Sequence, residues 1–304
     1  LKSRLLREAR ACGRIGHPNV VAVYDVGTLD DGVPFLVMEL LVGETLESKL
    51  AREGRLDAAT GARIGTDVAR ALAAAHAATI VHRDLKPANI FLHTEAEGAP
   101  PVVKVLDFGV SKILAEGAGS EARATATGHA VGSPAYMSPE QARSANKVDP
   151  RSDVWALGVV LFEMLAGAGP FPGETAYAVV GEILHGPIPT LRDVVPDVDP
   201  RLSELIGRCI VRDVNARIRT AEEVATALEA IGRDLGKSPR ESASETTEPL
   251  GNNRLRAAVL GGGLRLSVPD LDEPLPQRAS SPEIATPVMP ASVCTASRAW
   301  IESS

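Results

Sequence analysis

The chain has 304 residues, 44% of them hydrophobic and 23% charged, which is enough for the core of one large domain or two modest ones. Its net charge of −7 argues against nucleic acid as the main partner, because the chain has no general basic field. Three cysteines in no metal-ligand spacing indicate a reduced, cytoplasmic setting. No apolar run is long enough to predict a membrane span.

In chain order, the first predicted element is a helix that runs into a His-Pro-Asn turn at 17–19. Two β-like runs follow at 20–26 and 34–41, with an Asp-Gly turn between them. From there to about residue 235, helical patterns dominate.

Two of these helical patterns are distinctive. Apolar residues recur at helical spacing over 64–75, after Asp57 as a candidate N-cap. The run at 154–165 is apolar on all sides, which indicates a helix surrounded by protein.

The last predicted helix lies at 221–231 and is expected to begin with a capping box between Thr220 and Glu223. The stretch 232–238 resembles a nucleotide-binding P-loop, but it has three residues between its glycines where four are required. It also follows a helix rather than a strand, so we interpret it as a helix end and linker. Residues 236–304 are rich in Pro, Ser and Thr without a sustained period, so we expect a mostly disordered tail.

Two stretches carry the candidate chemistry, HRDLKPANIF at 82–91 and VVKVLDFGV at 102–110. The proline after Lys86 prevents a plain helix, so the first stretch is predicted to be a loop. The second is a β-branched strand that ends in Asp-Phe-Gly and places a carboxylate at the strand end. An amide oxygen and a carboxylate together are ligands that Mg²⁺ accepts, alongside phosphate oxygens. Phosphoryl transfer needs such a metal, a base for the hydroxyl and a lysine near the phosphate.

Joined in this order and spacing, the two stretches resemble the eukaryotic-like serine/threonine protein kinases that bacteria also carry. The resemblance implies ATP and Mg²⁺ as cofactors and the Ser and Thr hydroxyls of proteins as substrates. It implies that Asp84 is the catalytic base and that Lys86 steadies the γ-phosphate. Asn89 and Asp107 would hold two Mg²⁺ ions, and no nucleic acid partner is implied.

The stretch GSPAYMSPE at 132–140 resembles the end of a kinase activation segment. By this resemblance Glu140 pairs with Arg217, and removal of either would leave an uncompensated buried charge. Asp153 matches an aspartate that supports the backbone of the catalytic loop and is interpreted as structural. A solvated N-cap is its alternative.

The same resemblance assigns roles along the activation segment. Arg83 is expected to bind a phosphate on the activation loop through charge-assisted hydrogen bonds. Thr125 and Thr127 are the candidate autophosphorylation sites, with hydroxyls that merely face water as the alternative. Ser133 stands where the family usually has threonine, and its hydroxyl can still reach Asp84. The residues so implicated are Arg83, Phe108, Gly109, Thr125, Thr127, Ser133 and Glu140, and Phe108 is expected to stack with His82.

The resemblance places the adenine of ATP against residues 34–46. Met38 resembles the gatekeeper, and Glu39 to Leu41 resemble the hinge whose backbone reads the base edge. Phe91 is expected to pack beneath the adenine ring. For Met38 and Phe91, ordinary core packing is the alternative.

Glu8 matches a helical glutamate whose partner, in the family, is a lysine on an earlier strand. Lys2 lies on the same helix about 240° away from Glu8 and cannot be that partner. The Gly-rich phosphate loop does not appear either, so we expect a fragment of a longer kinase or an impaired enzyme. A pseudokinase that docks partner proteins, and a small-molecule phosphotransferase, are the alternatives.

The resemblance therefore implies an α+β, protein kinase-like fold. Residues 1–41 would be a remnant of the small lobe, comprising one helix and two strands, and 42–235 would be the mainly helical large lobe. Residues 236–304 would form the disordered tail, which could bind a partner of its own. The sequence does not name the protein substrate or the activating signal.

Overall fold

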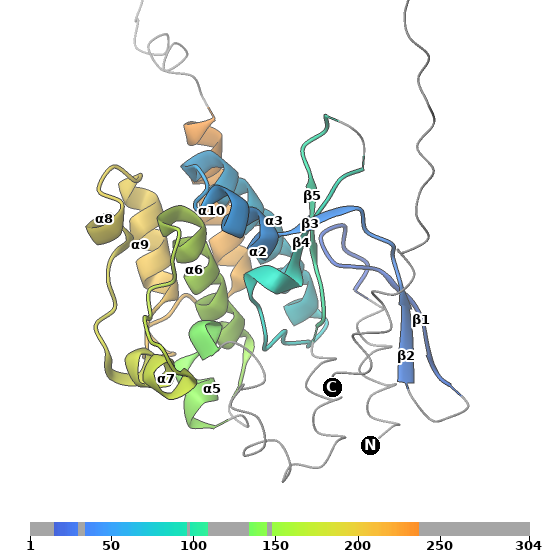
Figure 1. Cartoon of the computed structure of the whole chain (residues 1–304), viewed down its shortest axis with the longest axis horizontal. Coiled ribbons are helices and arrows are strands. Elements are labelled where there is room, and N and C mark those ends of the chain that lie inside the picture. The colour runs from blue at the N-terminus through green and yellow to red at the C-terminus, as the bar shows by residue number, and fades with distance from the viewer. Residues whose placement is uncertain (1–14, 30–33, 96–97, 109–133, 145–147, 237–304) are drawn as a thin grey trace, which may run out of the picture. The chain divides into compact units, whose positions relative to one another are not determined.

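The computed structural model describes residues 15–29, 34–95, 98–108, 134–144 and 148–236, and every structural statement below concerns those residues (Figure 1). The chain divides into two compact units, 1–247 and 248–304, of which the second lies outside the described residues. The expected disordered tail lies outside them as well, apart from residue 236. The described part is a mixed α+β fold of short strands and more numerous helices.

The strands form two small antiparallel sheets. β1 (Val23–Thr28) pairs with β2 (Pro34–Met38) as a hairpin. β3 (Gly43–Thr45), β4 (Ile90–His93) and β5 (Val102–Val105) form a three-stranded sheet with β4 in the centre. The hairpin prediction is confirmed with shorter bounds than 20–26 and 34–41 imply. β3 was not predicted, because three residues are too few to display an alternating pattern.

The segment before β1 is attached to β5. The side-chain amide of Asn19 donates to the carbonyl of Val103 at 2.9 Å. The backbone N–H of Val105 donates to the Asn19 carbonyl, and the N–H of Val21 donates to the Val105 carbonyl. Asn19 is buried, so the Asn of the His-Pro-Asn turn fixes the start of the hairpin to the three-stranded sheet.

The helices account for many more of the described residues than the strands do. The α-helices are α2 (Leu46–Glu53), α3 (Ala58–Ala77), α5 (Pro139–Arg143), α6 (Pro150–Ala166), α7 (Ala176–His185), α8 (Leu191–Val194), α9 (Pro200–Cys209) and α10 (Ala221–Leu235). Two 3₁₀ turns, η1 (Pro87–Asn89) and η2 (Pro134–Tyr136), lie beside the site described below. No helix in the described ranges is long and apolar enough to cross a membrane.

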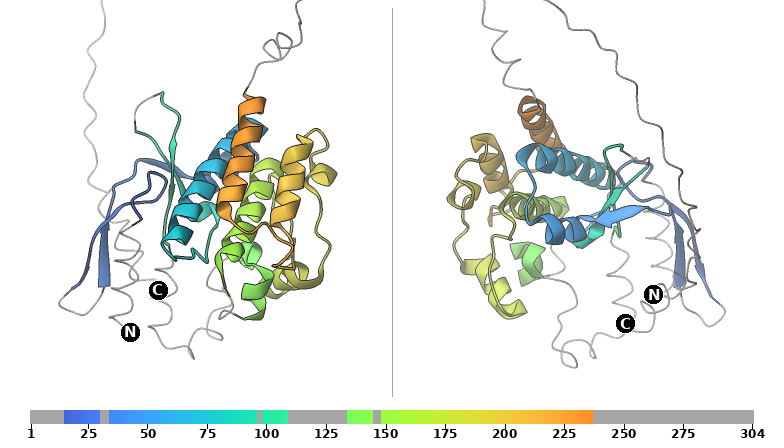
Figure 2. Two further views of the ribbon diagram at one scale, coloured as in Figure 1. Left: turned by 180° about the vertical axis from the view of Figure 1, so that it is seen from behind. Right: turned by 45° about the horizontal axis from the view of Figure 1, so that its top comes forward.

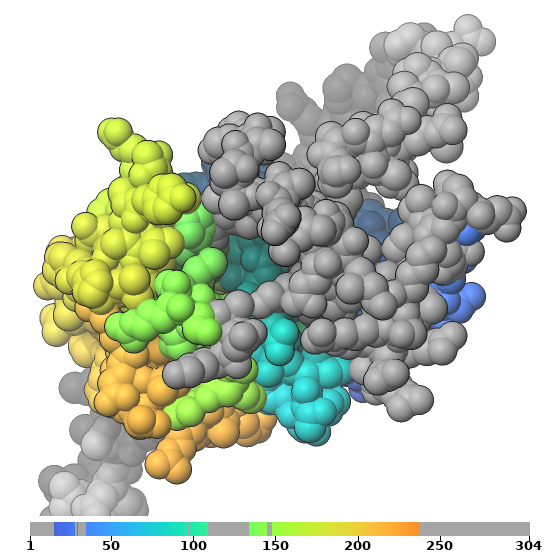
Figure 3. All heavy atoms as spheres, turned by 90° about the horizontal axis from the view of Figure 1, so that it is seen from below, coloured from blue at the N-terminus to red at the C-terminus, as the bar shows by residue number. Residues whose placement is uncertain are grey.

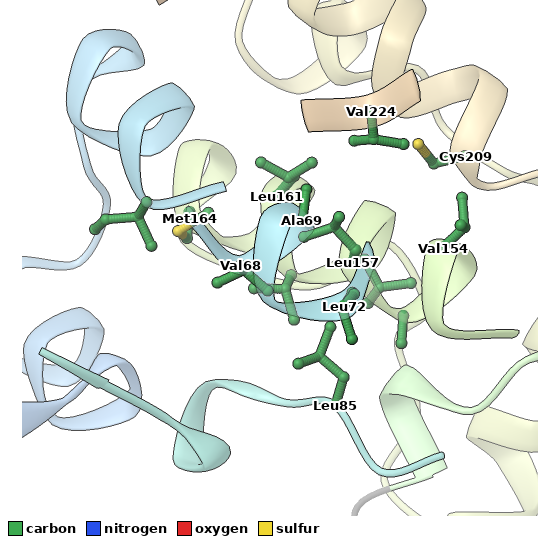
Figure 4. Close-up of a cluster of buried hydrophobic side chains, with 14 of the residues drawn as sticks. Val68, Ala69, Leu72, Leu85, Val154, Leu157, Leu161, Met164, Cys209 and Val224 are labelled. Atoms are coloured by element: carbon green, nitrogen blue, oxygen red, sulfur yellow. The ribbon is translucent and has the colours of Figure 1, made fainter. Parts of the chain in front are cut away.

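The core lies where α3, α6 and α10 pack side by side. The front and back views both show these three helices next to one another (Figure 1, Figure 2). The predicted all-round burial of α6 is confirmed, since its residues from Ser152 to Phe162 are all buried. Figure 4 shows Leu72 of α3, Leu157 of α6 and Val224 of α10 in one cluster, together with Leu85 from the loop after α3. Leu85 is 1% exposed and therefore anchors that loop to the core.

The helix ends test two capping predictions. The Asp57 carboxylate accepts the N–H of Thr60 at 2.9 Å, so the predicted N-cap of α3 is confirmed. The hydroxyl of Thr220 accepts the N–H of Glu223, as expected. The reciprocal half of the capping box is wrong, because the Glu223 carboxylate accepts from the Thr220 hydroxyl rather than from its backbone. α10 continues to Leu235, so the P-loop-like stretch begins as helix.

Candidate active site

Residues 82–86 form a loop, and the single 3₁₀ turn η1 follows with Pro87 in its first position. The predicted loop is wrong at residues 90 and 91, which begin the strand β4. Within the loop, the Lys86 ammonium donates to the Asp84 carboxylate at 2.8 Å. The side-chain amide of Asn89 donates to the Asp84 carbonyl at 2.8 Å and reaches its carboxylate at 3.4 Å. The loop therefore brings three of the candidate residues into one hydrogen-bonded group.

Asp153 of α6 supports the backbone of this loop. Its carboxylate accepts the backbone N–H of His82 at 2.8 Å and that of Arg83 at 2.9 Å. Arg83 has a φ of +69°, a conformation that costs free energy and that these contacts help to hold. His76 of α3 also contacts the carboxylate, at 2.8 Å. Asp153 is 1% exposed and Asp149 caps α6, so the alternative of a solvated N-cap is wrong.

His82 connects the loop to the end of β5. Its Nδ1 accepts the N–H of Asp84 at 3.3 Å, so the proton that reaches the Leu106 carbonyl, at 2.8 Å, is on Nε2. The His82 ring meets the ring of Phe108 edge-on, with centroids 4.8 Å apart. Both rings are buried, so they join the Asp84 loop to the Asp107-Phe108 segment.

Asp107 follows β5 with a left-handed φ of +55°. The backbone N–H of Leu106 donates to the Asn89 carbonyl at 2.9 Å, which holds this strand end against the catalytic loop. Burial raises the pKa of the Asp107 carboxyl above its ordinary value; Asp84 raises it further, while His82 and Lys86 oppose this. The charged groups of the loop are thus close enough to Asp107 to shift the pKa of its carboxyl.

The same residues can be examined as a metal site. The two hydrogen bonds from the Asn89 side chain to Asp84 both come from its amide nitrogen. In the described part of the chain, no hydrogen bond reaches its Oδ1 atom. Asn89 therefore offers an uncommitted amide oxygen, and Asp107 offers a carboxylate. Hard oxygen donors of this kind fit Mg²⁺ better than they fit softer metals.

The residues predicted to bind the nucleotide lie at the end of β2, in the segment after it and in β4. Met38 is 43% exposed, so the alternative that it is a core residue is wrong. Phe91 of β4 is half-buried. The N–H of Glu39 donates to the Ala22 carbonyl, whereas the backbone of Leu41 makes no hydrogen bond within the described residues.

One residue beside this path was missed by the sequence analysis. Lys104 of β5 is 9% exposed, lies opposite Phe91 in the sheet and forms an ion pair of 2.7 Å with Glu39. The available signal was a single lysine within the β-branched strand VVKV, because a charge in such a strand needs a partner.

Glu140 of α5 and Arg217 form a two-pronged ion pair with distances of 2.7 and 3.0 Å. Arg217 also donates to two backbone carbonyls, and its guanidinium lies 5.2 Å from the centroid of the Trp155 ring. Burial alone would raise the pKa of Glu140, but hydrogen bonds from Arg217 and Ser152 outweigh it and lower the pKa to about 2.

The remaining predicted residues are placed only in part. Arg83 is exposed, and its guanidinium makes no hydrogen bond in the part of the chain that the structure describes. Five candidates lie outside the described residues: Glu8, Gly109, Thr125, Thr127 and Ser133.

Comparison with known proteins agrees with this geometry. Residues 1–227 match the model of the protein kinase domain. The chain is 36% identical over 249 residues to the serine/threonine-protein kinase pkn3 of Myxococcus xanthus, covering 80% of this chain and 45% of that protein. It is 37% identical over 259 residues to the serine/threonine-protein kinase PknL of Mycobacterium tuberculosis, covering 83% of this chain and 62% of that protein.

A third relative, the probable serine/threonine-protein kinase PknB of Corynebacterium glutamicum, is 35% identical over 254 residues, which are 81% of this chain and 38% of that protein. The chain thus spans about half the length of the curated relatives that it matches. The chain belongs to the protein kinase family.

Proposed function

We propose that this chain carries the catalytic part of a serine/threonine protein kinase, which transfers the γ-phosphate of ATP to Ser and Thr hydroxyls of proteins. The observation that supports this most is the group formed by Asp84, Lys86 and Asn89, held against Asp107 by the Leu106–Asn89 backbone hydrogen bond. The names of the bacterial relatives point to the same activity.

In this proposal the Asp84 carboxylate orients the substrate hydroxyl and accepts its proton. Lys86 keeps that carboxylate in place and adds positive charge next to the phosphate that moves. Asn89 and Asp107 would hold Mg²⁺, which offsets the negative charge of the phosphates when it is bound.

The nucleotide and activation-segment roles belong to the same proposal. Met38, Glu39 and Leu41 would line the adenine, with Phe91 beneath it. The uncommitted backbone of Leu41 supports a role in reading the base edge, and the exposed Arg83 guanidinium supports capture of a phosphate. The proposal also includes a small-lobe remnant at 1–41, a large lobe at 42–235 and a tail at 236–304 that binds a partner of its own.

The test is phosphate transfer by the 304-residue chain, incubated with Mg²⁺, γ-labelled ATP and myelin basic protein as a generic Ser/Thr-containing substrate. We expect weak label on serine and threonine of the substrate, in keeping with the impaired enzyme that the sequence predicts, and none above background from Asp84→Asn, which keeps the shape of the side chain. Wild-type label equal to that of the Asp84→Asn blank would contradict the proposed function. That result would favour the alternative role, the binding of partner proteins without phosphate transfer. The names of the relatives and the contacts among Asp84, Lys86 and Asn89 favour the kinase instead.

A further inference from the structure

The ten-residue helix α7 forms a support for the end of the activation segment. It packs against η2 and against α5, the two short elements of the stretch 134–143. The space-filling view shows α5, in green, directly beside α7, in yellow-green, on one face of the molecule (Figure 3). A displacement of α7 would therefore move the surface on which, under the proposed function, a protein substrate lies.

The C-terminal end of α7 needs donors from elsewhere. The Glu182 carbonyl accepts the N–H of Gly186 at 2.9 Å, but the next carbonyl, that of Ile183, would need a donor from Pro187, which has no N–H. Arg212 fills this role. Its guanidinium donates to the carbonyls of Ile183 at 2.7 Å, Glu182 at 2.8 Å and Gly186 at 2.5 Å. A cation at this end is also favoured by the helix dipole.

Arg212 lies in the same short loop as Arg217, between α9 and α10. Arg217 binds Glu140 of α5, whereas Arg212 binds the end of α7. Two arginines of one loop therefore fasten two elements that pack against each other. The sequence analysis identified only Arg217 in this loop.

We propose that Arg212 is a positioning residue for the protein substrate: by fixing the C-terminal end of α7, it holds the surface formed by η2 and α5. This inference rests on the proposed kinase function. Arg212 contacts none of the residues around Asp84, Lys104 or Phe91 in the described part of the chain, so its removal should affect protein substrate binding and leave ATP binding unchanged.

The first test measures the anchoring directly and does not depend on catalysis. Hydrogen exchange of the peptide covering 176–186 is compared between wild type, Arg212→Ala and the matched control Arg208→Ala. Arg208 is an exposed arginine at the end of α9 whose side chain makes no hydrogen bond in the described residues. We expect exchange at the end of α7 to accelerate about tenfold in Arg212→Ala. Equal exchange in Arg212→Ala and Arg208→Ala would overturn the proposal.

The second test separates the two substrates of the reaction. In Arg212→Ala we expect the KM for myelin basic protein to rise about fivefold and the KM for ATP to stay within about twofold. Arg212→Lys, which keeps the charge but loses the planar fork, should lie between wild type and Arg212→Ala. If Arg212→Ala does not fold, Arg212→Lys alone must show the higher protein KM.

The outcomes of the second test are distinct. An unchanged protein KM, or equal increases in both KM values, would overturn the positioning role. Absence of any phosphate transfer by wild type would instead contradict the proposed function, and the exchange measurement would still decide whether Arg212 anchors α7.

Discussion

Lys104 and Glu39 form an ion pair that joins the strand before Asp107 to the residue after β2. The two closest atoms are 2.7 Å apart, and the side chains are 11% and 20% exposed. Burial alone would raise the pKa of Glu39, but the hydrogen bonds from Lys104 and from the N–H of Ala22 outweigh it and lower the pKa. The carboxylate is therefore ionised, and it depends on Lys104 for its compensating charge.

Replacing Lys104 with methionine should leave that carboxylate partly buried without its cation. We expect the free energy of unfolding to fall by about 2–4 kcal/mol, and affinity for an ATP analogue to fall because residues 39–41 lose their attachment to β5. Urea denaturation and titration with a fluorescent ATP analogue measure the two effects. Lys49→Met is the control, since the Lys49–Glu53 pair is one turn apart on a helix surface and should contribute about 0.5 kcal/mol or less.

The double variant Lys104→Met with Glu39→Leu sharpens this test. Because it removes both charges, it should recover much of the lost stability. A single Lys104→Met variant that is no less stable than Lys49→Met would show that the pair does not hold the segment.

The Glu140–Arg217 pair predicts an acid dependence of stability. The folded pKa of Glu140 is lowered from 4.5 to about 2, so its stabilising contribution is complete above the unfolded pKa. That contribution is lost as the pH falls from about 4.5 to about 2, and it amounts to about 3 kcal/mol. Urea unfolding of wild type and Glu140→Gln at pH 6, 4 and 2.5 measures it. We expect the difference between the two proteins to shrink as the pH falls, and a difference independent of pH would contradict this assignment.

Asp153 should be required for activity although its side chain is buried. Asp153→Asn replaces one carboxylate oxygen with an amide donor, so only one of the N–H groups of His82 and Arg83 keeps its acceptor and the catalytic loop loses part of its support. We expect the rate of phosphate transfer to fall about a hundredfold, because small misplacements of reacting groups have effects of this size. Asp197→Asn, at an exposed position, is the control. Equal rates in the two variants would mean that the loop keeps its geometry without Asp153.

Asp107 should contribute to metal binding. Asp107→Asn removes the carboxylate charge at the proposed magnesium site, so we expect affinity for Mn²⁺, used as a paramagnetic substitute, to fall at least about tenfold. Electron paramagnetic resonance of free Mn²⁺ in the presence of an ATP analogue measures this affinity. The Asp197→Asn control should bind as wild type does. Unchanged affinity in Asp107→Asn would remove Asp107 from the proposed metal site.

The sequence was sufficient to predict the elements that depend only on residues close together in the chain. Proline after Lys86 predicts the loop, and the all-apolar run predicts the buried helix α6. Asp57 predicts the start of α3, since a side-chain cap depends on neighbours a few residues away. The roles assigned to Asp84, Asn89 and Asp107 came from resemblance, and the structure places these residues in adjacent segments.

What the sequence did not reveal depends on contacts between distant segments. Lys104 and Glu39 are 65 positions apart, and Arg212 lies 29 positions beyond Ile183, so no local pattern connects them. The capping box was half wrong for a smaller reason: the Glu223 side chain had two available donors on Thr220, and sequence spacing does not decide between them.

The loop that carries Asp84 alternates reactive side chains with anchored ones: His82 and Leu85 are both 1% exposed. A search for inactivating mutations should therefore return interior positions as readily as the residues proposed to bind the nucleotide. Leu85→Ala, which removes only hydrocarbon, would belong among the loss-of-function variants, and purified protein would be needed to distinguish it from a chemical knockout.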